Sequence, residues 1–197
     1  QKLNPYRFVI GGLAVLLGLS FGLSFFAISP ITPLIIDEYG INHSTASLLT
    51  SLVSLTHIIF AIPGSMLMGR VGLKKLILLG WVLVSAPMLT FLAESFLVLL
   101  ALRVLYGVGF ALIFPAMGPL AMQWFRSREL PLANGLFITM ASLGVAISTF
   151  SVAPMAEAIG WKVALSLFGG LSLVGALCWL VLGRGQTQKG AGEAESP

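Results

Sequence analysis

Six apolar stretches, each long enough to cross a membrane as a helix, constrain what this chain can fold into. They cover residues 8–34, 45–68, 76–93, 96–122, 131–154 and 163–183. A helix needs about 20 mainly apolar residues to span the hydrocarbon of a bilayer, where it satisfies its own backbone hydrogen bonds. Only 9% of the residues are charged, against about a quarter in soluble domains. The sequence therefore predicts an all-α integral membrane protein with six transmembrane helices.

The cations gather at alternate ends of these stretches. Nine fall on one predicted side of the membrane: Lys2, Arg7, Arg70, Lys74, Lys75, Arg126, Arg128, Arg184 and Lys189. The opposite side has only Lys162, and Arg103 lies inside the fourth stretch. The positive-inside rule predicts that both termini are cytoplasmic, and we expect the plasma (inner) membrane of a bacterium or archaeon. This distribution favours lipid headgroups over nucleic acid as the partner of the cations.

The sequence carries no signature of an enzyme. Cys178 is the only cysteine, which excludes an internal disulfide and a multi-cysteine metal site. We find no P-loop, no paired histidines, no nucleophile elbow and no dinucleotide fingerprint. No cofactor or metal is expected, and the small, polar residues 184–197 are predicted to form a flexible cytoplasmic tail or linker.

An internal repeat divides the predicted six-helix bundle, residues 1–183. Seven residues recur as the same residue type 88 positions later: Ser54, Leu55, Ile59, Gly72, Lys74, Leu79 and Leu83. At an offset of 85, Gly22 meets Gly107, Phe25 meets Phe110 and Pro30 meets Pro115. The repeats would cover about 8–93 and 96–183, the second inverted because three helices is an odd number. Inverted repeats are typical of secondary transporters, and the inversion would explain the exceptional Lys162.

Two motifs resemble those of the major facilitator superfamily. The family turn after the second helix reads roughly G-x-L-a-D-R-x-G-R-K, and "SMLMGRVGLK" supplies Leu67, Arg70, Gly72 and Lys74. It departs from that turn at Ser65, Gly69 and Leu73. The fourth family helix reads roughly R-x-x-q-G-x-G, and "RVLYGVG" supplies Arg103, Gly107 and Gly109, with Tyr106 at the usual amide position. The resemblance covers nearly the whole chain, but only the amino-terminal six-helix half of a usual family member.

The resemblance implies secondary active transport of a small solute, by symport or antiport, through rocker-switch alternating access. In the family, the turn that here holds Arg70, Gly72 and Lys74 is a conformational latch made by cations and an acidic residue. Gly69 stands where that acid would be, so the latch must be weaker here or use another partner. Alternatively, the cations serve topology and phosphate contacts only. Gly72 also suits a tight turn that needs a positive φ.

Polar residues inside the spans are the candidates for substrate binding or coupling. Arg103 would lie about 10 Å deep, where an arginine costs about 2.5–3.5 kcal/mol. As a functional residue, it would attract an anion or govern a proton site. As a structural residue, it would hydrogen-bond neighbouring carbonyls. His57 could couple proton movement, or it could simply hydrogen-bond a neighbouring helix. By the family resemblance, in which the first and fourth helices line the cavity, Ser24, Phe25 and Tyr106 complete the candidate set.

Other residues shape the helices. Pro30 can bend the first span, and Gly107 and Gly109 permit close backbone approach. On the fifth span Asn134, Thr139, Ser142 and Ser148 are weaker ligand candidates, because that segment is also typical of a packing face.

The seven acidic residues all fall in predicted turns or the tail, so no carboxylate is expected inside a span. Because Arg103 does lie inside a span, the sequence favours a small anion as solute. Six helices offer one wall of a cavity, so we expect a second six-helix half or a second copy as partner. The alternative function is a non-transporting assembly or interaction subunit of a membrane complex.

Overall fold

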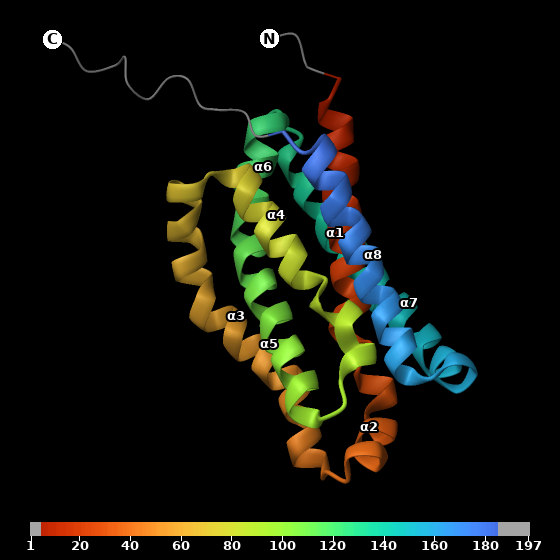
Figure 1. Ribbon diagram of the computed structural model, residues 1–197. Helices are drawn as coiled ribbons and strands as arrows, with labels where there is room; N and C mark the ends of the chain where they lie inside the picture. Colours follow the sequence, from red (N-terminus) through yellow and green to blue (C-terminus); the bar gives the residue numbers. More distant parts are fainter. Residues whose placement is uncertain (1–4, 185–197) are drawn as a thin grey trace, which may run out of the picture.

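Six helical spans in the described part of the chain, residues 5–184, are long and apolar enough to cross a membrane. The computed structural model (Figure 1) contains only helices and short connections over that range, which confirms the predicted all-α fold of six spans. With η marking 3-10 segments, the elements are α1 (Arg7–Phe26), η1 (Ser29–Ile31), α2 (Thr32–Tyr39), α3 (His43–Val71), α4 (Leu73–Val84), η2 (Ala86–Leu92), α5 (Phe96–Ile113), η3 (Phe114–Ala116), α6 (Met117–Trp124), α7 (Leu130–Ile159) and α8 (Trp161–Leu182).

Most observed spans extend beyond the predicted ranges, because the helices continue past the apolar residues until a capping residue ends them. The first span, predicted over 8–34, runs over Arg7–Tyr39 and ends at Gly40, which adopts a left-handed conformation with φ 61°. The expectation that every acidic residue lies in a turn or the tail is therefore wrong. Asp37 and Glu38 belong to the last turn of α2, and Glu157 belongs to the last turn of α7. The predicted tail lies outside the described residues, except for Arg184.

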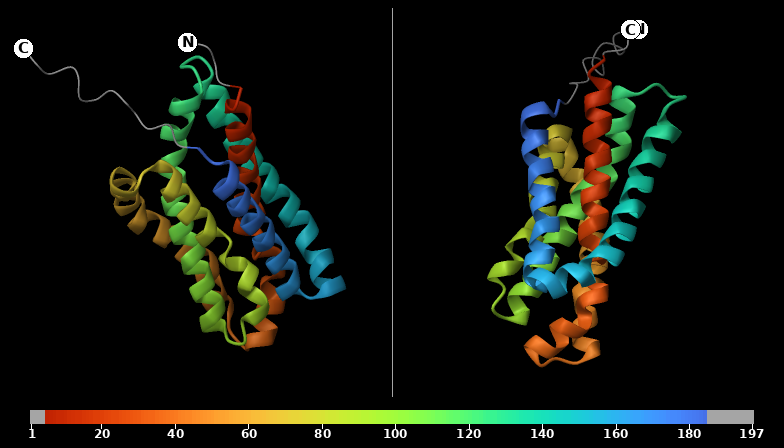
Figure 2. Two further views of the ribbon diagram at one scale, coloured as in Figure 1. Left: turned by 45° about the horizontal axis from the view of Figure 1, so that its top comes forward. Right: turned by 90° about the vertical axis from the view of Figure 1, so that its right-hand side faces the viewer.

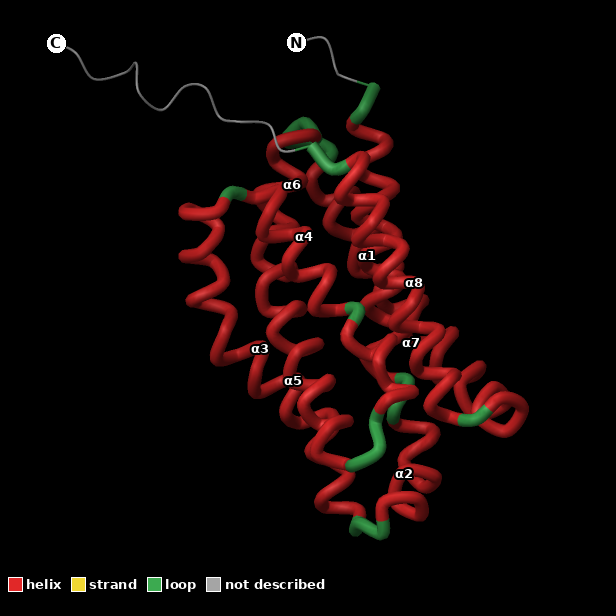
Figure 3. The backbone as a smooth tube through the Cα atoms, in the orientation of Figure 1, coloured by secondary structure: helices red, strands yellow, loops and turns green. Residues whose placement is uncertain are grey.

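Three of the spans are interrupted by 3-10 segments that the apolar pattern alone did not predict. Each segment has a proline at its first or second position, where the missing N–H and fixed φ interrupt the α-helical ladder. Pro30 opens the break between α1 and α2, Pro115 the break between α5 and α6, and Pro87 the break after α4. The remaining connections are short (Figure 3).

The two triplets of helices share local geometry at the repeat offsets. Gly72 and Gly160 end the second helix of each triplet with nearly the same backbone, φ 83° and ψ 154° against φ 85° and ψ 142°. The breaks η1 and η3 fall at equivalent positions of the first helices. A Cβ on Gly22 would strike the backbone of Ala141, and one on Gly107 would meet the backbone of the equivalent residue, Val53. The two triplets therefore share local backbone geometry at the offsets of the predicted repeats.

The helices of the two triplets also pack in a reciprocal way. α1 lies along α7, and α5 lies along α3, so the first helix of each triplet packs on the middle helix of the other. α8 lies beside α1 and η2, and α4 lies beside α5, as the views in Figures 1 and 2 show. The middle helices α3 and α7 are the least covered: 22% of the residues in their most apolar stretch are buried, against 39–50% in the other spans. They therefore present the largest uncovered faces of the bundle.

The two ends of the bundle differ in charge. The start of α1, the end of α8, the α3–α4 turn and the α6–α7 turn lie together at one end (Figure 1). This end carries the predicted cationic cluster, and we call it the basic end. At the opposite end, the exceptional cation Lys162 is paired with Glu38, with 2.6 Å between Nζ and Oε1. The indole of Trp161 donates a second bond of 2.6 Å to the same carboxylate, so this ion pair ties α2 to α8.

Candidate functional site

Three helices position the residues that the sequence singled out for binding or coupling. Ser24 and Phe25 lie near the end of α1, His57 lies in the middle of α3, and Arg103 and Tyr106 lie on α5. Two hydrogen bonds join α5 to α1, and the ring of Phe110 on α5 contacts His57 of α3 on one side and Phe21 of α1 on the other. The structure therefore brings the five candidates to one place, where α1, α3 and α5 meet.

Arg103 is buried, with 3% of its surface exposed, and it reaches from α5 to α1. Its Nη1 donates to the backbone carbonyl of Ser24 at 2.9 Å. That carbonyl is one of the last four of α1, which lack partners inside their own helix and carry the negative end of the helix dipole. The guanidinium thus braces the end of α1 just before the break at Pro30, which is one of the two roles that the sequence left open.

The brace leaves hydrogen-bonding capacity unused. Nη2 of Arg103 and Oγ of Ser24 are both buried and have no hydrogen-bond partner among the described residues. No carboxylate of the described chain pairs with Arg103; the two ion pairs found there involve Arg7 and Lys162. A buried guanidinium with one free N–H group and no carboxylate partner in the described chain is suited to an anionic or strongly polar ligand.

Tyr106 supports this arrangement from the same face of α5. It is fully buried, and its hydroxyl donates to the carbonyl of Phe21 at 2.9 Å. Its ring lies 5.8 Å from the guanidinium carbon of Arg103, within the range of a cation–π contact. Tyr106 therefore holds both α1 and the arginine side chain in position.

An aromatic cluster lies against the ring of Tyr106, and the sequence interpretation recognised only part of it. Phe110 lies at its centre, with its ring centroid 4.2 Å from those of both Phe21 and His57. Phe25 lies 6.3 Å from Phe110, and Phe114 lies 5.5 Å from it. In the sequence, Phe110 stands out only as a repeat match to Phe25, and Tyr106 follows Phe21 at the same offset of 85 residues. That coincidence of four aromatic residues is the signal that could have identified the cluster.

His57 is half-buried in this cluster and does not hydrogen-bond a neighbouring helix as one alternative expected. Its ring stacks on Phe110 and meets Phe114 edge-on, with centroids 5.7 Å apart. Its Nδ1 is buried and has no hydrogen-bond partner in the described range. The imidazole therefore keeps an unused hydrogen-bonding position inside the cluster.

The weaker candidates on α7 do not join this group. The hydroxyl of Ser142 donates to Ile138 at 3.0 Å, and that of Ser148 donates to Val145 at 3.0 Å, both within their own helix. Thr139 is exposed, and Asn134 lines a separate pocket near the basic end.

The α3–α4 turn holds the residues assigned to a conformational latch. Gly72 has the positive φ that such a turn needs. Arg70 is exposed and Lys74 half-exposed, and neither pairs with a carboxylate within residues 5–184. The backbone carbonyl of Lys74 accepts a bond of 3.1 Å from the indole of Trp179 on α8, which anchors the turn without using its charges.

The two glycines of the α5 motif permit close helix contacts. A Cβ on Gly107 would lie 3.0 Å from the carbonyl oxygen of Val53 on α3. A Cβ on Gly109 would lie 2.6 Å from the carbonyl oxygen of Gly80 on α4. Because larger residues would separate these helices, the glycines keep α5 between its neighbours with Arg103 directed at α1.

Comparison with known proteins provides a family and several relatives. A model of the Major Facilitator Superfamily matches residues 14–196. An uncharacterised protein of Campylobacter jejuni is 28% identical over 170 residues, which cover 86% of this chain and 53% of that relative. A probable sulfoacetate transporter of Cupriavidus necator is 29% identical over 88% of this chain and 40% of its own length. A probable nitrate transporter of Staphylococcus carnosus is 28% identical over 82% and 42%. The chain thus spans about half, or less, of the length of these relatives.

Proposed function

Because this chain belongs to the major facilitator superfamily, we propose that it forms one wall of a membrane transporter for small anions. The carrying observation is the buried guanidinium of Arg103, which has a free Nη2 beside the free hydroxyl of Ser24 and no carboxylate partner in the described chain. A membrane-embedded arginine is costly and is usually retained for a functional contact. The sulfoacetate and nitrate named for two relatives are both anions, which supports the same class of solute.

In this proposal the anion binds between the aromatic cluster and a second six-helix unit. Arg103 supplies the charge, Ser24 a hydrogen bond, and Phe25 and Tyr106 the apolar walls. His57, at the edge of the cluster, is the candidate for proton coupling, in either symport or antiport. No carboxylate among residues 5–184 pairs with the guanidinium, which keeps its positive charge available to the solute.

The second unit is the second half of a longer chain, a separate chain or a second copy. Two observations support it: the relatives are about twice as long, and the uncovered helices α3 and α7 flank the aromatic face. Rocking of the two units would expose the cluster alternately to the two sides of the membrane. We assign the basic end to the cytoplasm of a bacterium, where Arg70 and Lys74 would meet an acidic partner on the second unit.

Uptake into vesicles from cells that express the intact protein tests this function. We expect saturable uptake of sulfoacetate or nitrate, and none of uncharged glycerol. Arg103→Gln should abolish uptake, whereas Arg103→Lys should retain part of it because the charge remains. Lys75→Gln removes an exposed cation at the basic end and serves as the matched control. Wild-type uptake by the Arg103→Gln protein would contradict the role of Arg103, and no uptake of either anion by the wild-type protein would favour a non-transporting subunit.

A further inference from the structure

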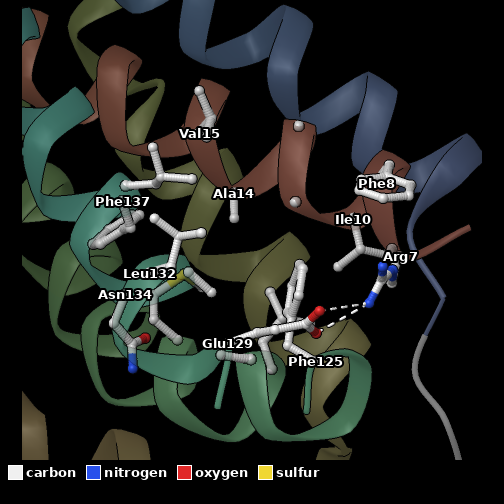
Figure 4. Close-up of a pocket in the computed structure, with 17 residues that line it drawn as sticks. Arg7, Phe8, Ile10, Ala14, Val15, Phe125, Glu129, Leu132, Asn134 and Phe137 are labelled. Atoms are coloured by element: carbon white, nitrogen blue, oxygen red, sulfur yellow. Dashed lines mark hydrogen bonds and ion pairs between the residues drawn. The ribbon is translucent and has the colours of Figure 1, made fainter. Parts of the chain in front are cut away.

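A pocket opens between α1 and α7 because these helices separate toward the basic end. In the middle of the bundle they touch through Gly18, Gly22 and Gly144, where an added Cβ would collide with the backbone of the opposite helix. Nearer the basic end, a Cβ on Gly12 would meet nothing within 4 Å, and one on Gly11 would meet only the ring of Phe125. The space left by these two glycines, closed on one side by α6, has a volume of about 330 Å³ (Figure 4).

The walls of this pocket are apolar, and its polar groups are few. Figure 4 shows aliphatic and aromatic side chains around the cavity, with the ion pair of Arg7 and Glu129 at one end. Nη1 of Arg7 lies 3.0 Å from each oxygen of the Glu129 carboxylate. The interior therefore suits a hydrocarbon chain, and the charged groups at its end suit a polar headgroup.

The charge around that end is positive. Arg126 and Arg128 lie in the turn just before Glu129, and the backbone N–H of Arg126 donates to its carboxylate. Neither arginine side chain forms an ion pair within the described chain. Arg7 and Arg126 both act electrostatically on this carboxylate, and Arg128 lies in the same turn. Three arginines and one glutamate thus leave an excess of positive charge at this end of the pocket.

The mouth of the pocket is apolar on its outer side. Phe8 is 68% exposed and Leu132 is 66% exposed, on the two helices that border the opening. Large exposed apolar side chains next to a basic cluster at a helix end are the arrangement expected at the level of lipid headgroups.

We propose that this pocket binds an anionic phospholipid, with one acyl chain between α1 and α7 and its phosphate at Arg7 and Arg126. A small inorganic anion would leave the apolar volume empty. A zwitterionic lipid would fill the volume but would not match the excess of positive charge. The proposal does not depend on which solute the protein transports, and it assigns no role to the aromatic cluster.

Native mass spectrometry of the purified chain, after incubation with equal amounts of dioleoyl phosphatidylglycerol and dioleoyl phosphatidylcholine, tests this site. We expect preferential retention of phosphatidylglycerol. Gly12→Leu should abolish the preference by filling the cavity, because the helix has room there for a side chain. Gly69→Leu, an equal change at a helical position with nothing within 4 Å, should leave it unchanged.

Two charge variants test the headgroup contact independently of the cavity. Arg7→Gln should weaken retention of phosphatidylglycerol about fivefold, and Glu129→Gln should strengthen it by removing the competing carboxylate. Equal retention of the two lipids by the wild-type chain would overturn the proposal, as would unchanged retention by Gly12→Leu. Displacement of the lipid by soluble glycerol phosphate at low concentration would show a headgroup site without a chain pocket, and would also overturn it.

Discussion

Replacing Arg103 by leucine separates its binding role from its structural role, because the structural terms nearly cancel. The variant loses a charge-assisted hydrogen bond to Ser24, worth about 1.5–3 kcal/mol, and a cation–π contact with Tyr106, worth about 2 kcal/mol because both groups are buried. It also removes the cost of burying an arginine, about 2.5–3.5 kcal/mol. We therefore expect the free energy of unfolding to fall by about 1 kcal/mol, and by about 2.5 kcal/mol at most, which lowers Tm by less than about 10 °C.

The assay is thermal unfolding of the detergent-purified protein with and without sulfoacetate. A ligand at a hundredfold excess over its Kd stabilises the folded state by about 2.7 kcal/mol, and Arg103→Leu should lose this increment completely. Tyr106→Phe is the control: it removes one neutral hydrogen bond, costs about 1 kcal/mol and should keep the anion-dependent increment. The reasoning is refuted if Arg103→Leu lowers Tm by more than about 10 °C while the remaining folded protein is still stabilised by the anion.

Three further predictions concern packing and the two ends of the bundle. Gly22→Leu should destabilise the protein by about 3 kcal/mol, because its side chain strikes the backbone of α7, whereas Gly69→Leu should not; chemical denaturation compares them. Lys162→Gln should speed proteolysis at the α7–α8 turn by breaking the ion pair with α2, and unchanged cleavage would argue against that tie. The pKa of Glu129 lies below its ordinary value, chiefly because the backbone N–H of Arg126 donates to the carboxylate. The guanidinium groups of Arg7 and Arg126 lower this pKa further. The stability from Glu129 is thus present at neutral pH and lost below about pH 4.3, so the Tm difference from Glu129→Gln should shrink on acidification.

The sequence predicted the spans well because membrane helices are specified by long apolar runs and by the cations at their ends. It did not predict where those helices stop. Tyr39 and Ile159 extend their spans to the glycines that follow, so Glu38 comes within reach of Lys162. Such a contact depends on helix length and on the packing of α2 against α8, which local sequence does not report.

The candidate site was predicted in part. Spacing on α5 and the family resemblance identified Arg103 and Tyr106, and both face α1 as a shared helical face requires. The sequence could not decide between anion binding and carbonyl bracing for Arg103, because one guanidinium has enough donors for both. Phe110 was overlooked as a site residue because an isolated phenylalanine in an apolar run is ordinary; only the contact between helices makes it the centre of the cluster.

The most direct test of the central claim is water access to the aromatic face of the intact protein. In a Cys178→Ser background, Phe25→Cys should react with a membrane-impermeant maleimide from one side of the membrane. The reactive side should change when an anion gradient drives the protein to its other conformation. Absence of reaction from both sides under all gradients would mean that the cluster is packed permanently inside the bundle, and would contradict a transport role for this face.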